Sequence, residues 1–165
     1  MSPENLKLVI GLGNPGKEYH DTYHNVGHLF VDSLEKISDL KFPADAKALA
    51  GKQVLKSNVF MNNSGLFVKK ELKSRKLKPE NLLIVHDDSD IEFGKVKLSV
   101  GRGSAGHKGV QNIIDQIKTK NFWRLRIGIR PIEKTRNKAG DFVLKKISPT
   151  NKKTLQNIFK TYYLL

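Results

Sequence analysis

The chain has 165 residues, with 30 Lys and Arg, 16 Asp and Glu and no cysteine, which gives a net charge of +14. The lack of cysteine excludes a disulfide framework and a thiolate zinc site. No stretch approaches the ~18 apolar residues of a membrane span, so we expect a soluble cytoplasmic protein, and the length predicts a single domain over residues 1–165.

The first half of the chain alternates predicted strands and helices. Residues 6–11 are predicted to form a buried strand, because four of these six residues are apolar. Apolar side chains recur at helical spacing over residues 24–40, which predicts a helix. A short strand is predicted at 52–57. The Asn and Ser residues at 62–64 are favourable N-cap residues, and they predict a helix that continues to residue 76.

The second half continues the same alternation. Residues 81–88 form a second apolar run with polar groups at its end, and residues 95–100 alternate basic with apolar side chains, as in a half-buried strand. After a glycine-rich loop, helical patterns follow at 107–119 and at about 149–161, with a strand between them at 123–130. This order predicts a three-layer α/β fold, in which helices flank a mixed, mostly parallel sheet.

The strand at 123–130 has a strict alternation. Trp123 and its apolar partners take one face, whereas Arg124, Arg126 and Arg130 take the other. The alternation predicts a basic stripe along this strand.

Positive charge is concentrated in the second half of the chain. Residues 1–90 hold 13 Lys and Arg against 12 Asp and Glu, whereas residues 91–165 hold 17 against 4. A general enrichment in lysine would raise the positive charge of both halves of the chain. The segregation therefore favours a polyanionic partner, of which RNA and DNA are the obvious class.

Two glycine-rich stretches only partly match nucleotide-binding motifs. Gly11, Gly13 and Gly16 satisfy G-x-G-x-x-G after a strand, but Pro15 removes a backbone N–H that a pyrophosphate would use. No acidic residue ends a clear second strand ~20 residues later. The stretch 101–108 resembles a phosphate loop but lacks G-K-[ST]. Both patterns argue against a nucleotide cofactor.

A metal site is a further alternative. His20, His24 and His28 are spaced by four, and acidic residues cluster at 87–90. However, the chain has no H-E-x-x-H motif and no thiolate ligand. We therefore predict no metal.

A stronger pattern joins four polar residues at the ends of predicted elements. Asn14 lies in the first turn, His24 at the entrance of the first helix, Asn62 at the start of another helix, and Asp87 at the end of the second apolar strand. Each residue alone has an ordinary explanation as a turn former, cap or surface group. Together they suit hydrolysis of an ester, because a histidine oriented by a carboxylate can take a proton from water and amides can hold a carbonyl oxygen.

Five ordered motifs give this chain a specific resemblance to a known family. GLGNPGKEYHDTYHNVG, FMNNSG, HDDSD, GSAGHKG and FWRLRIGIRP, in that order, resemble bacterial-type peptidyl-tRNA hydrolase over nearly the whole chain. The resemblance implies a usually monomeric α/β enzyme without metal or nucleotide cofactor. It would hydrolyse the ester between peptide and tRNA in peptidyl-tRNA and so recycle tRNA from abandoned translation.

The resemblance also implies roles for individual residues. His24 would activate water, and Asp87 would orient it; Asn14 would position the tRNA 3′ end, and Asn62 would hold the peptide and the ester. The implied set that binds tRNA or substrate comprises Tyr19, Met61, Lys97, Arg102, His107, Lys108 and Arg126.

Two departures from the family pattern concern binding. Lys108 stands where the family motif has Asn, and Ser99 occupies a position that is usually basic. A lysine has donors only and cannot reproduce an amide's acceptor. Two alternatives therefore remain: a non-catalytic RNA-binding relative of the splicing-factor type, and a different ester hydrolase on the same scaffold.

Overall fold

The computed structural model describes residues 3–38, 52–131 and 142–162. The strands are β1 (Leu8–Gly11), β2 (Gln53–Lys56), β3 (Leu82–Glu92), β4 (Val96–Val100) and β5 (Trp123–Arg130). They form one sheet in the order β2-β1-β3-β5-β4, in which β4 is antiparallel to β5 and the other pairs are parallel. The predicted mixed, mostly parallel sheet is confirmed.

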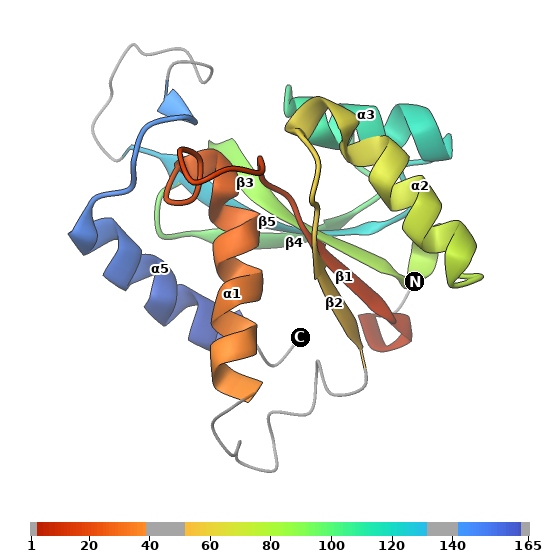
Figure 1. Cartoon of the computed structure of the whole chain (residues 1–165), viewed down its shortest axis with the longest axis horizontal. Coiled ribbons are helices and arrows are strands. Elements are labelled where there is room, and N and C mark those ends of the chain that lie inside the picture. Colours follow the sequence, from red (N-terminus) through yellow and green to blue (C-terminus); the bar gives the residue numbers. More distant parts are fainter. Residues whose placement is uncertain (1–2, 39–51, 132–141, 163–165) are drawn as a thin grey trace.

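Helices cover both faces of this sheet (Figure 1). The α-helices are α1 (Val26–Ser38), α2 (Ser64–Ser74), α3 (Lys108–Ile117) and α5 (Pro149–Tyr162). The short 3-10 turns are η1 (Pro3–Asn5), η2 (Tyr23–Asn25), η4 (Met61–Asn63) and η5 (Pro79–Asn81). α1 and α5 lie on one face of the sheet, and α2 and α3 lie on the other. The three predicted layers are therefore present.

The alternation of side chains along β1 divides the core into two clusters. Val9 packs with residues of α1 and α5, such as Phe30 and Phe159. Leu8 and Ile10 point to the opposite face and pack with residues of α2 and α3. Both faces of the strand are buried, as expected for the centre of a parallel sheet.

Two glycines let the start of α1 approach the sheet closely. A Cβ atom on Gly11 would lie 2.2 Å from the carbonyl oxygen of Gly27, and a Cβ atom on Gly27 would lie 2.3 Å from the carbonyl oxygen of Val85. Neither position has room for a larger residue. This contact fixes the residues just before α1, among them His24, beside the middle of β3, where Asp87 lies.

The boundaries of the predicted elements differ from the observed ones in informative ways. β3 continues to Glu92, so Asp87 lies within a strand rather than at its end; the pairing with β5 becomes irregular between Asp88 and Glu92. The helix predicted at 24–40 is preceded by the η2 turn, and residues 39–40 lie outside the described residues. Within the described ranges, no helix is both long and apolar enough to cross a membrane.

The basic face of β5 is not a solvent-exposed stripe. Arg124 is 1% exposed, and the side chain of Arg126 is largely buried in an ion pair; of the three arginines, only Arg130 at the strand end is exposed. The strand has neighbours on both sides, and the loop that follows β4 lies over Arg124. The alternation was predicted correctly, and the structure adds that most of the basic face is buried.

Candidate active site

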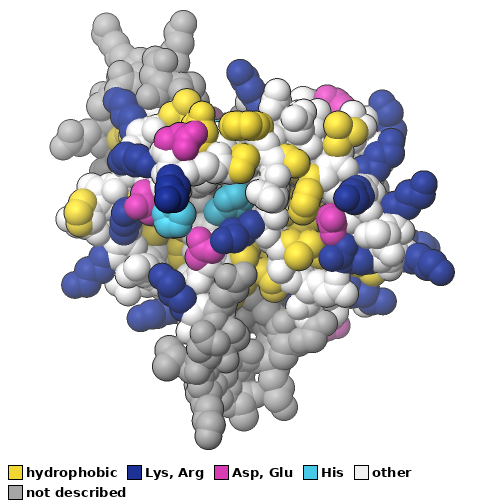
Figure 2. Space-filling model, in the orientation of Figure 1, with side chains coloured by type: hydrophobic (Ala, Val, Ile, Leu, Met, Phe, Trp, Pro, Cys, Tyr) yellow, Lys and Arg dark blue, Asp and Glu magenta, His cyan; other side chains and the backbone are white. Residues whose placement is uncertain are grey.

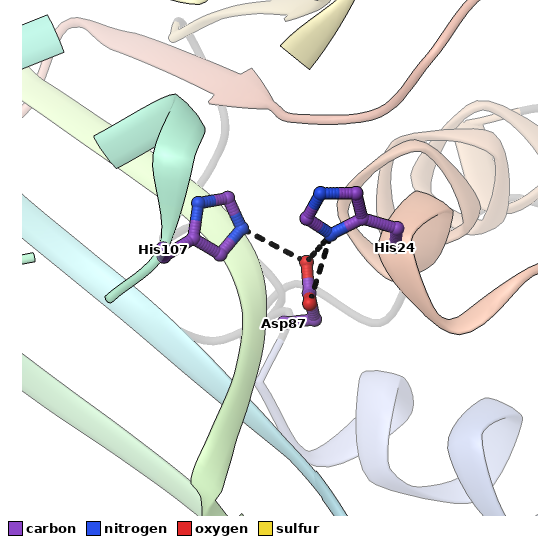
Figure 3. A group of neighbouring side chains, drawn as sticks. All are labelled: His24, Asp87 and His107. Atoms are coloured by element: carbon purple, nitrogen blue, oxygen red, sulfur yellow. Dashed lines mark hydrogen bonds and ion pairs between the residues drawn. The ribbon is translucent and has the colours of Figure 1, made fainter. Parts of the chain in front are cut away.

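Three side chains from separate parts of the sequence converge beyond the carboxyl end of β1 (Figure 3). Asp87 comes from β3, His24 from η2, and His107 directly precedes α3. His24 Nδ1 lies 3.0 Å from each carboxylate oxygen of Asp87, and His107 Nε2 lies 3.0 Å from Oδ1. One buried carboxylate therefore accepts hydrogen bonds from two imidazoles.

The carboxylate determines which nitrogen of His24 carries a proton. An ionised carboxylate can only accept hydrogen bonds, so His24 Nδ1 must donate. In the neutral ring this leaves Nε2 with a free lone pair. Because the ring lines a cavity, that lone pair is available to a water molecule or substrate.

His107 has the same role as donor to Asp87, but its proton is placed for a different reason. The backbone N–H of Val110 donates to His107 Nδ1 at 3.2 Å, as the side-chain cap of α3. Nδ1 is therefore an acceptor, and Nε2 carries the proton that is donated to Asp87. The cap thus orients the ring and selects its tautomer.

The two imidazoles keep Asp87 ionised. Burial alone would raise the pKa of this carboxyl, but His107 and His24 favour the carboxylate through charge and hydrogen bonds and hold its pKa far below the usual range. Behind them, burial lowers the pKa of His86 well below its ordinary value. Its ring lies edge-on to that of His107, with the ring centroids 4.7 Å apart.

The same three residues also form a possible metal-binding group. One ligand atom each from His24, Asp87 and His107 lies within 4.8 Å of the others. A metal-ligating histidine normally donates its other N–H to an acceptor. His107 Nδ1 instead faces the N–H of Val110, so Nε2 could not bind a metal without breaking the helix cap. The geometry favours hydrogen bonding over metal ligation.

A cavity of about 500 Å³ opens beside the three residues. Its polar wall includes Asn14, Asn62 and Lys108. Its apolar wall is formed by Phe60, Met61, Val143 and Leu144. The cavity therefore offers hydrogen-bond donors, a cation and apolar contact surface to a ligand.

The hydrogen bonds of Asn14 determine which of its groups faces the cavity. The backbone N–H of Met61 donates to Asn14 Oδ1 at 2.8 Å. Of the two ends of the Asn14 amide, only the oxygen can accept this bond. The NH₂ group therefore remains available to donate to a substrate. Asn25 exchanges two hydrogen bonds of 2.9 Å with the Asn14 backbone and holds the turn in place.

The other residues predicted to contact substrate differ in how close they lie to this cavity. Asn62 and Lys108 are exposed at its wall, and buried Met61 forms part of it. Tyr19 is not among the cavity-lining residues; its ring packs edge-on against Phe60 with centroids 6.1 Å apart. Tyr19 therefore supports the rim rather than the cavity itself.

The basic residues predicted to bind tRNA also differ in exposure. Lys97 on β4 and Arg102 in the following loop are exposed. Arg126 donates from Nε to Asp88 Oδ2 at 2.7 Å, and its side chain is only 12% exposed. A phosphate at Arg126 would have to compete with that carboxylate. In the view of Figure 2, Lys and Arg side chains surround a centre where hydrophobic and histidine side chains are exposed.

Sequence reasoning missed the apolar rim of the cavity. Phe60 and Leu144 are about half exposed, at 49% and 51%. The segment that contains Leu144 is brought to the site by a hydrogen bond from the His24 N–H to the carbonyl oxygen of Val143, 2.8 Å long. Phe60 was next to a predicted residue and so could have been found, whereas nothing in the local sequence marks residues 143–144.

Comparison with known proteins identifies the family of this chain. The family model described as peptidyl-tRNA hydrolase matches residues 8–163. The peptidyl-tRNA hydrolases of Aquifex aeolicus and Persephonella marina are 43% and 39% identical to this chain; the alignments cover 94% and 93% of it and 85% of each relative. The crystal structure of peptidyl-tRNA hydrolase from Acinetobacter baumannii superposes with a TM-score of 0.79 at 32% identity, covering 97% of this chain and 86% of that one. This chain belongs to the peptidyl-tRNA hydrolase family.

Proposed function

We propose that this protein hydrolyses the ester bond between the peptide and the tRNA in peptidyl-tRNA, releasing a free peptide and a reusable tRNA. The observation that carries the proposal is the hydrogen-bonded pair of His24 and Asp87 beside a cavity, in a chain of the peptidyl-tRNA hydrolase family. The alternative of a non-catalytic RNA-binding relative finds no support in the comparisons, since the relatives and structures named above are described as hydrolases.

His24 is the proposed general base. Its Nε2 takes a proton from water while the water oxygen attacks the ester carbonyl carbon. Asp87 keeps Nδ1 protonated and stabilises the positive charge that the ring then acquires. The imidazolium next gives its Nε2 proton to the departing ribose oxygen as the carbon–oxygen bond breaks, so the histidine ends the cycle in its starting state.

Amide groups and a lysine are placed to hold the ester. The NH₂ of Asn14 can donate to the carbonyl oxygen, where negative charge develops during the attack. We assign Asn62 to the ester and the peptide, with Met61 and the apolar rim contacting peptide side chains. Lys108 supplies a cation at the cavity wall, which suits an anionic part of the substrate.

The tRNA body is proposed to lie over the basic second half of the chain. Lys97, Arg102 and Arg126 are the proposed phosphate contacts, and Tyr19 lies near the terminal nucleotide. As the family resemblance implies, we propose that the protein acts as a single-domain monomer without a cofactor. We place that activity in the cytoplasm, where tRNA is used.

The decisive experiment measures release of labelled N-acetyl-aminoacyl groups from tRNA by the purified protein. Unacetylated aminoacyl-tRNA serves as the comparison substrate. His24→Ala should lose nearly all activity, because no other described group in the cavity is positioned as the base. His20→Ala is the matched control, since His20 is an exposed histidine paired with Asp21 outside the catalytic cavity.

The outcomes separate the candidate functions. Rapid release that depends on His24 and prefers the acetylated substrate supports a peptidyl-tRNA hydrolase. Tight binding of tRNA without release would indicate a binding protein that shares the fold. Hydrolysis of a small ester with no requirement for tRNA would indicate a different hydrolase.

A further inference from the structure

Within the described part of the chain, Arg124 is a buried cation without a direct ion-pair partner. It is 1% exposed, and its Nη2 donates to the carbonyl oxygens of Arg102 at 3.0 Å and of Gly103 at 2.9 Å. Among the described residues, no carboxylate pairs with it; the nearby Asp88 accepts from Arg126 instead. The charge of Asp88 favours the Arg124 cation, but without a direct ion pair the burial still costs desolvation free energy, which an apolar side chain would avoid. Core stability therefore does not explain an arginine here.

The two carbonyls lie in the loop that leads to His107. This loop, residues 101–106, is largely exposed and contains three positive-φ residues, at Gly101, Ala105 and Gly106. A Cβ atom added to Gly103 or Gly106 would meet nothing within 4 Å. The loop is thus not held by packing at these positions.

Few other contacts hold the loop. At its start the N–H of Gly101 donates to the carbonyl oxygen of Lys120. Near its end the Ser104 hydroxyl donates to Gln111, and the Ser104 carbonyl oxygen accepts from the N–H of His107 at 3.1 Å. The two bonds from Arg124 are the contacts at its middle in the described structure. Ala105 and Gly106 then form part of the wall of the catalytic cavity. A shift of the loop would therefore change the shape of the cavity and the position of His107, which follows the loop directly.

The sheet places Arg124 directly beneath this loop. Arg124 of β5 pairs with Ser99 of β4, two residues before the loop begins. Ser99 Oγ, Arg124 Nη1 and His86 Nε2 are buried polar atoms without a partner in the described structure. The Nη1 group of Arg124 therefore keeps unused donors beside the Nη2 group that holds the loop. Burial lowers the pKa of Arg124 to about 10, so it remains a cation at neutral pH.

We propose that Arg124 is a positioning residue for catalysis: it tethers the 101–106 loop and so holds His107 against Asp87. It touches no substrate. Its effect passes through the loop to the Nε2–H of His107, which donates to the carboxylate that orients His24. The expected effect on kcat rests on the proposed function, whereas the expected effect on the position of His107 does not.

The test compares Arg124→Met with Arg124→Lys and with a matched control on the same strand face. Arg130→Met is that control, because Arg130 is exposed at the strand end and lines neither the loop nor the cavity. Arg124→Met should lower kcat roughly 10- to 100-fold, as expected when catalytic groups are displaced. Its thermal midpoint should stay near that of the parent. Arg124→Lys, which keeps a donor under the carbonyls, should recover part of the activity.

A double-mutant cycle with His107→Ala tests the route of the effect. If Arg124 acts through His107, adding Arg124→Met to His107→Ala should lower kcat by less than about 2-fold more, whereas independent effects would multiply. Multiplying effects would overturn the proposal, and so would an Arg124→Met enzyme with unchanged kcat.

A second readout needs no turnover. The ¹⁵N spectrum of histidine side chains reports the protonated nitrogen of His107, and its Nε2–H signal should be present in the parent and in Arg130→Met but absent or broadened in Arg124→Met. An unchanged signal contradicts the tether even if the protein proves to lack hydrolase activity. If both Arg124 variants fail to fold, the residue is structural and the proposal is wrong.

Discussion

Asp87 holds His24 by both carboxylate oxygens, each 3.0 Å from the same imidazole nitrogen. This contact joins β3 to the turn before α1, which are 63 residues apart in the chain. The proton on Nδ1, and therefore the free lone pair on Nε2, follows from this one contact. A change at Asp87 tests it directly.

Replacing Asp87 by Asn should remove most of the activity without removing the side chain. The Asn NH₂ group would face His24 and favour the wrong tautomer, so we expect kcat to fall by roughly 100- to 10,000-fold. Steady-state release of N-acetyl-aminoacyl groups measures this. Asp90→Asn, three residues along and exposed, should retain parent activity. An Asp87→Asn enzyme within about 3-fold of the parent would refute the assigned role.

Asn14→Asp should distinguish the role of the Asn14 amide oxygen from that of its NH₂ group. The remaining oxygen can still accept from the Met61 N–H, but the donor facing the cavity is replaced by a negatively charged oxygen. Removing a donor to a developing oxyanion lowers kcat by roughly 100-fold or more. Asn63→Asp, at the exposed start of α2, is the control. Equal kcat in Asn14→Asp and parent would exclude the oxyanion role.

The basic residues beside the cavity should govern the salt dependence of binding. Because each of Lys97, Arg102 and Arg126 is assigned one phosphate, replacing any of them by Ala should reduce the slope of log affinity against log salt by ~1. The single-turnover rate at saturating enzyme should change little. Lys160→Ala, on the exposed side of α5, provides the comparison. A slope that does not change in any of the three variants would place the tRNA elsewhere.

His28 should make the protein less stable on acidification. Burial lowers the pKa of His28 to about 4, outweighing the hydrogen bond from its ring to the Ser57 carbonyl oxygen. The folded state therefore binds this proton more weakly than the unfolded chain, whose histidine pKa is about 6.5. The contribution of His28 to stability is complete above pH ~6.5 and decreases as the pH falls toward ~4.

Urea unfolding at pH ~7 and pH ~5 measures this contribution. Between these two pH values the free energy of unfolding of the parent should fall by about 2 kcal/mol more than that of His28→Phe, which cannot titrate. His20→Phe, a change at an exposed histidine, should behave like the parent. Equal decreases in the parent and in His28→Phe would show that His28 titrates normally in the folded protein.

The sequence alone determined the class of fold and the order of its elements. Strand and helix patterns depend on neighbouring residues, so apolar runs such as 6–11 and the alternation at 123–130 could be recognised without a structure. The family motifs also marked Asn14, His24, Asn62 and Asp87, because short ordered motifs can be read from neighbouring residues alone.

Only the tertiary structure decided which of these residues meet and which side chains are buried. His107 reaches Asp87 because β3 and β5 are neighbours in the sheet and the 101–106 loop folds over β5. The same arrangement buries Arg124, although alternation alone placed it on a polar face. Strand order and loop coverage are long-range properties, set by packing between distant segments, and no local pattern in the chain encodes them.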